Sequence, residues 1–103
     1  MAVTTKVFFR GAATTSTGTT LYTTAATETA IISNIVLANT SASAQTGTVA
    51  IDGTTILAAV SIAANSTTAI DLKVPLISTG TTKTITGGAS ATSVNIFISG
   101  VTL

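Results

Sequence analysis

The chain contains no cysteine, no histidine and no tryptophan, and it has a single proline. Without cysteine it can form neither a disulfide bond nor a thiolate metal site. Without histidine it lacks the side chain that most often acts as a general base near neutral pH. The residues that carry most enzymatic and metal-dependent chemistry are therefore missing from this sequence.

Charge is also scarce. Only 7% of the residues are charged, whereas about 25% is usual for a soluble domain, and the net charge is +1. The four cations, Lys6, Arg10, Lys73 and Lys83, are scattered, so we expect no nucleic-acid partner. A surface built from hydroxyls and amides opposes association only weakly, which favours a subunit of a larger assembly over a free monomer.

Long hydrophobic runs are absent too. No stretch approaches the roughly 20 apolar residues of a membrane helix, so we expect no membrane partner. The opening residues 1–6 lack the basic segment and apolar core of a signal peptide, which indicates synthesis in the cytoplasm. A chain of 103 residues is enough for one domain, which we place over residues 1–103.

Threonine is the commonest residue, with 25 copies, and its β-branched side chain suits strands better than helices. The longest apolar run, residues 29–39, reads as the central strand of the fold. In a regular strand Ile31, Ser33, Ile35 and Leu37 would share one face, and the intervening residues the other. Both faces are mostly apolar, so we expect this strand to be covered on both sides.

The remaining pattern predicts an antiparallel all-β sandwich of about eight strands. The expected strands cover residues 3–10, 19–24, 29–39, 46–51, 54–60, 67–74, 83–86 and 93–103. This spacing is typical of a jelly-roll and of an immunoglobulin-like topology, and it does not choose between them.

Turn residues punctuate these strands. Asp52-Gly53 is the strongest hairpin signal, because a tight two-residue turn requires positive φ. Pro75 cannot donate to a strand ladder, which places it at a strand end or sheet edge. We expect Leu76 and Ile77 to close one end of the core, and residues 87–92 to form a loop. Gly100 indicates a bulge or a close backbone approach.

The candidate catalytic groups are few. Glu28 is best explained as a turn carboxylate, Asp52 by its hairpin and Asp71 by an exposed strand face. Gly87-Gly88 has neither a following helix nor the Lys-Ser/Thr signature of a phosphate loop. We therefore predict no enzymatic activity, assign no catalytic, cofactor-binding or metal-binding residue, and expect no cofactor.

Sugar binding is a second class to consider, because exposed aromatic rings often serve as platforms for sugars. Phe9 and Phe97 are expected in the core, which leaves Tyr22 as the one candidate. A tyrosine that joins core and surface is the simpler interpretation.

Three segments carry a resemblance to a known group of proteins. They are residues 31–41 (IISNIVLANTS), residues 63–72 (AANSTTAIDL) and residues 89–100 (ASATSVNIFISG). In these patterns of apolar, small and turn residues the chain resembles small β-sandwich structural proteins of tailed bacteriophages, over its whole length. The resemblance implies a virion component without catalytic residues.

Within that group, a compact domain with few charges favours a capsid decoration or minor capsid protein that binds and stabilises the capsid lattice. A neck, tail or tail-fibre-associated module, or a carbohydrate-binding or host-binding sandwich, is the alternative. The expected partners are other copies of the chain, most simply in a trimer, and the major capsid protein or other virion proteins. The expected location is the virion, on the capsid surface, with contacts made through surface area and strand edges rather than ion pairs.

Overall fold

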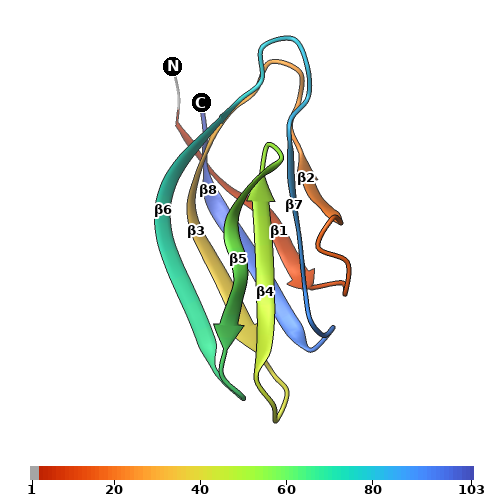
Figure 1. Ribbon diagram of the computed structural model, residues 1–103. Coiled ribbons are helices and arrows are strands. Elements are labelled where there is room, and N and C mark those ends of the chain that lie inside the picture. Colours follow the sequence, from red (N-terminus) through yellow and green to blue (C-terminus); the bar gives the residue numbers. More distant parts are fainter. Residues whose placement is uncertain (1–2) are drawn as a thin grey trace.

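The computed structural model describes residues 3–103, which form eight strands in two antiparallel sheets (Figure 1). The strands are β1 (Thr4–Ala12), β2 (Thr20–Thr23), β3 (Thr29–Asn39), β4 (Gln45–Ile51), β5 (Thr54–Ile62), β6 (Thr67–Ile77), β7 (Thr84–Ala89) and β8 (Val94–Thr102). One sheet has the order β1-β8-β3-β6 and the other β2-β7-β4-β5. The predicted all-β sandwich is confirmed, and β3, with a neighbour on each side, is an interior strand as expected.

The order of the strands also decides the topology. The pairs β1–β8, β2–β7, β3–β6 and β4–β5 are nested, as in one long hairpin that has been rolled up. Except for the β4–β5 hairpin, each strand is followed by a strand of the opposite sheet. This is the jelly-roll arrangement, one of the two topologies that the sequence pattern left open.

The core lies between the sheets and is aliphatic. Its largest fully buried side chains are those of Ile32, Ile35, Leu37, Ile62, Ile85, Ile96, Ile98, Val49 and Val94. At one end of the sandwich the buried Asn39 amide donates hydrogen bonds to three backbone carbonyl oxygens, those of Ser43, Ile62 and Ala63. This side chain ties together the chain segments that follow β3 and β5, because a buried amide must find partners.

β3 contains a β-bulge, so the regular alternation predicted for this strand is wrong. The pairing with β8 shifts between Ile32 and Asn34, so Ser33 is an extra residue. Because of this shift Ile32 and Ile35, three positions apart, both point into the core and are fully buried. Ile31 and Val36 lie on the opposite, outer face and are only partly buried. The outer face of β3 is thus not covered by any other part of residues 3–103.

A second bulge, in β1, sets the directions of Phe8 and Phe9. Val7 pairs with Ser99 and Phe9 with Ile98, so Phe8 is the extra residue. Phe8 is buried, and Phe9 packs against the core as predicted. Phe97, by contrast, lies on the outer face of β8 and is partly exposed, so its predicted place in the core is wrong. Its neighbours Ile96 and Ile98 take the inward positions.

The turn predictions are mostly confirmed. Asp52 and Gly53 both have positive φ, 51° and 76°, as a tight hairpin requires. Pro75 lies in β6, an edge strand of its sheet. At Gly100 a Cβ atom would lie 1.9 Å from the carbonyl oxygen of Ile31, which confirms the close backbone approach. Leu76 is buried, whereas Ile77 is 52% exposed and does not close the core.

The predicted loop over residues 87–92 is wrong in its first half, since Gly87, Gly88 and Ala89 belong to β7. Both glycines are needed here for space. A Cβ at Gly87 would lie 2.6 Å from the Thr48 carbonyl oxygen, and one at Gly88 would lie 2.3 Å from that of Ser16. The segment of residues 13–19 therefore lies directly against β7, and its carbonyl oxygens at Thr14 and Thr19 accept backbone hydrogen bonds from Ala89 and Gly87 of β7.

Candidate interaction surface

The acidic side chains lie on separate elements, each with its own partner. Glu28 ends the turn before β3, Asp52 is in the β4–β5 hairpin and Asp71 is on the outer side of β6. Lys83 forms a 3.7 Å ion pair with Asp52, and the Asn34 amide donates a 3.0 Å hydrogen bond to Asp71. Within residues 3–103 no three acidic side chains gather as a metal site would require.

Tyr22 is the centre of a small polar cluster near β1 and β2. Its hydroxyl donates a 2.5 Å hydrogen bond to Glu28, whose other oxygen accepts from the Ala25 N–H at 3.0 Å. Its ring meets Phe8 edge-on, with centroids 4.9 Å apart, and the Lys6 ammonium lies 5.1 Å from the ring centroid. Tyr22 therefore joins core and surface, and the Lys6 ammonium already lies over its ring.

The ionisation of this cluster follows from its contacts. Burial raises the pKa of Glu28, but hydrogen bonds from Tyr22 and the Ala25 N–H, with the charge of Lys6, outweigh it and leave that pKa below its usual value. Burial, with the hydrogen bond to Glu28, raises the pKa of Tyr22. The cluster holds the turn of residues 24–28 against the sandwich and offers no group poised for proton transfer near neutral pH.

The outer face of the β1-β8-β3-β6 sheet exposes a group of apolar side chains. We call it the apolar face. It carries Val7, Ile31, Val36, Ala38, Ala69, Pro75, Ile77, Phe97 and Val101, all partly or largely exposed. A group of exposed apolar side chains on one face, unlike scattered single ones, marks an interaction surface.

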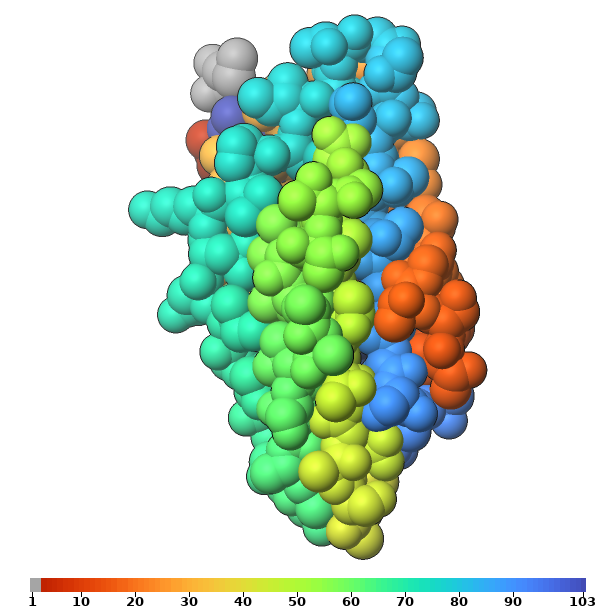
Figure 2. Space-filling model, viewed as in Figure 1, coloured from red at the N-terminus to blue at the C-terminus, as the bar shows by residue number. Residues whose placement is uncertain are grey.

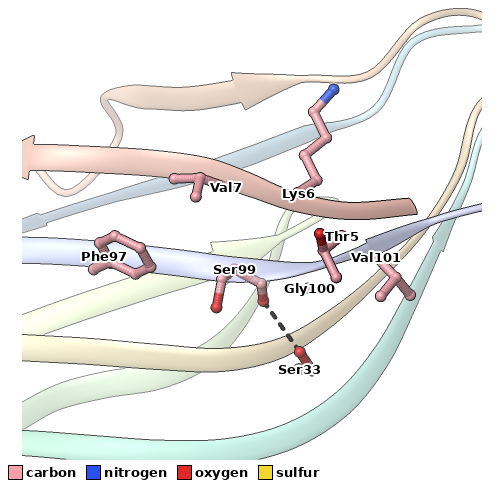
Figure 3. A pocket seen from close by; sticks show the side chains of 8 residues that line it. All are labelled: Thr5, Lys6, Val7, Ser33, Phe97, Ser99, Gly100 and Val101. Carbon is pink, nitrogen blue, oxygen red and sulfur yellow. Dashed lines mark hydrogen bonds between the residues drawn. The ribbon is translucent and has the colours of Figure 1, made fainter. Parts of the chain in front are cut away.

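A shallow depression of about 370 Å³ lies on this face, over β1, β8 and β3 (Figure 3). Val7 and Phe97 border it from neighbouring strands, and Gly100 and Ser99 form part of its floor. The Ser33 hydroxyl donates a 3.4 Å hydrogen bond to the Ser99 carbonyl oxygen across it. Ser33, the extra residue of the β3 bulge, lines the depression, and Gly100 lies beside it on β8. Its lining is mainly apolar and hydroxyl, which suits a protein side chain better than a charged ligand.

The opposite face of the sandwich has a different character. Figure 2 shows the outer side of β4, β5 and β7, beside the segment of residues 13–19 in orange. Many of its outward residues carry hydroxyls, namely Thr46, Thr48, Thr55, Ser61, Thr84 and Thr86, while β5 also exposes Ile56, Ala58 and Ala59. Hydroxyls stay hydrated at little cost, so this face has less apolar surface to bury than the apolar face.

The strand edges are poor sites for backbone pairing. In one sheet, edge strand β1 is bulged at Phe8, and β6 carries Lys73 and Pro75. In the other, β2 has four residues, and β5 is bulged where Ala59 takes a φ of 47°. Short strands, bulges, lysine and proline are the devices that prevent edge-to-edge association. The structure thus favours the apolar face over the strand edges as a contact surface.

The sequence indicated that β3 is apolar on both faces, but the bulge at Ser33 decides which of its residues share the outer face with Phe97. No protein-family model, curated protein or solved structure matches this chain. No helix long and apolar enough to cross a membrane occurs in the described part of the chain.

Proposed function

We propose that the protein is a non-enzymatic structural component of a tailed-bacteriophage virion, and specifically a capsid decoration or minor capsid protein. The observation that carries the proposal is the apolar face on a chain with so few charges. A free protein with this surface would tend to associate, whereas a subunit of a particle buries it. The sequence resemblance to phage structural proteins adds support.

The shape of the domain suits this role. The described domain measures about 45 × 23 × 18 Å, with the apolar face on one broad side. An elongated sandwich of this kind, alone or paired with a second copy, can lie along a lattice and contact neighbouring capsomers. Jelly rolls serve in viral capsids and also in lectins, so the topology is compatible with the role but does not establish it.

The sugar-binding alternative gains no support from the geometry. Its one candidate platform, Tyr22, packs edge-on against Phe8, lies beside Lys6 and has its hydroxyl bound to Glu28. A sugar would have to displace the Lys6 side chain to stack on that side of the ring. The neck or tail remains the competing position within the virion.

The test is to follow the protein through purification of phage particles from cells infected by the phage that encodes it. An immunoblot should detect the protein in density-purified particles, and electron cryomicroscopy should place its density on the capsid surface. Because the chain carries few charges, its contact with the particle should contain few ion pairs, so washing with about 1 M salt, where screening reaches about 3 Å, should leave the protein bound. Absence from purified particles would refute the virion role, and density on the neck or tail would refute the decoration role.

A further inference from the structure

The apolar face has an internal order that bears on its partner. Its side chains form rows across the sheet, each with one residue from β1, β8, β3 and β6 in turn. Three successive rows are Thr5, Val101, Ile31 and Pro75; then Val7, Ser99, Asn34 and Asp71; then Arg10, Phe97, Val36 and Ala69. The middle of the first and third rows is apolar, the middle of the second is polar, and the charges lie at the two lateral edges.

We propose that a second copy of this chain packs on the apolar face, about a two-fold axis that runs parallel to the strands between β8 and β3. Such an axis reverses the order of the strands and keeps each row at about the same height. Phe97 then lies against the partner's Val36, and Val101 against the partner's Ile31. The polar Ser99 meets the partner's Asn34. Apolar groups thus face apolar groups, and polar groups face polar groups.

The charges at the two edges, Arg10 on β1 and Asp71 on β6, favour this axis over a two-fold axis that runs across the strands. Rotation about the strand direction places β1 over the partner's β6, with Arg10 offset from the partner's Asp71 by one row, about 7 Å along the strands. With stacked sheets about 10 Å apart, the two Cα atoms are then about 12 Å apart, a distance that extended arginine and aspartate side chains can bridge together. Lys73 would face the stretch from Thr5 to Val7 of the partner, where Lys6 is turned toward its own Tyr22. A two-fold axis across the strands would instead bring β6 onto β6 and set the two Asp71 carboxylates near each other.

The shape and size of the face agree with a pair. Pro75 is in the same row as Thr5 and Val101, which line the depression, so the axis directs the proline ring of each copy toward the depression of the other. Four strands of up to 11 residues present about 36 × 19 Å, or about 700 Å². This is close to the roughly 800 Å² that each partner contributes to a standard interface.

A pair of this kind replaces the trimer expected from the sequence, because a face that fits itself about one two-fold axis closes after two copies. The inference rests on the proposed assembly role and names the surface through which copies meet. Its test uses the purified protein alone, so the two proposals can fail separately.

The first experiment is sedimentation equilibrium on the wild type and on charge variants. The wild type should be a dimer, and Asp71→Arg should weaken it about tenfold, or about 1.4 kcal/mol, since it sets like charges together twice. Adding Arg10→Asp to Asp71→Arg should restore the affinity. The control Thr55→Arg, on the hydroxyl-rich face, should change nothing. Circular dichroism checks that each variant is folded.

The second experiment exploits the absence of cysteine. Stacked sheets lie about 10 Å apart, too far for a direct disulfide but within reach of a short bismaleimide. Ser99→Cys should be cross-linked into dimers, whereas Thr55→Cys should not. A monomeric wild type, a dimer indifferent to Asp71→Arg, or equal cross-linking at both positions would overturn the proposed pair. A monomer found on particles would leave the virion role standing, and a dimer missing from particles would leave the pair standing.

Discussion

Alanine substitution at three isoleucines of β3 tests the bulge that organises the sandwich. In a regular strand Ile31 and Ile35 would share a face and should cost the same when shortened, while Ile32 would differ. With the bulge at Ser33, Ile32 and Ile35 are the fully buried pair, and Ile31 is partly exposed on the outer face. The three substitutions remove the same atoms, so their costs report burial alone.

The magnitudes follow from burial. Truncating a fully buried isoleucine to alanine costs about 2–5 kcal/mol, because it removes transfer free energy and leaves a cavity. We expect about 3–4 kcal/mol each for Ile32→Ala and Ile35→Ala, and about 1 kcal/mol for Ile31→Ala. For a domain of this size 1 kcal/mol shifts Tm by about 4–8 °C. The buried variants should therefore melt more than 10 °C lower than the wild type.

The assay is urea unfolding followed by circular dichroism, at protein concentrations low enough that association adds no stability. Equal losses for Ile31→Ala and Ile35→Ala, with a small loss for Ile32→Ala, would show that β3 is regular and that the bulge is wrong. That result would also contradict the assignment of Ile31 to the apolar face, because its side chain would then point inward.

Three further predictions concern other parts of the fold. Ile35→Lys should prevent folding, because an unpaired charge in a fully buried site costs several kcal/mol, and a soluble variant with an unchanged Tm would contradict this. Gly53→Val should destabilise the hairpin by about 1–3 kcal/mol in thermal melts, since valine strains at a φ of 76°; a normal Tm would refute that turn. The pKa of Glu28 in the folded state is lowered from 4.5. The stability that the ionised Glu28 adds to the fold is therefore present above pH 4.5, and it is lost as the pH falls through the pKa of the folded state. Glu28→Gln should flatten the dependence of stability on pH in that acidic range, and identical pH profiles for both proteins would argue against the cluster with Tyr22.

Part of the candidate site was predictable from residues. The scarcity of charge and the apolar outer positions of β3 pointed to an associating surface, and the edge position of Pro75 followed from its missing N–H. Phe97 was misplaced because strict alternation, carried along β8 without its partners, does not show which set of side chains faces the other sheet. That choice depends on Ile96 and Ile98, whose inward positions follow from pairing with β1 and β3.

The sequence by itself determined the all-β class, the Asp52-Gly53 hairpin and the extent of β3, because these depend on local properties: β-branched side chains, positive φ and an unbroken apolar run. Only the tertiary structure decided the jelly-roll order, the bulges at Phe8 and Ser33 and the place of Gly87-Gly88 inside a strand. These features arise between segments far apart in the chain. A bulge depends on the register between paired strands, and a glycine is required where a distant backbone comes too close for a Cβ.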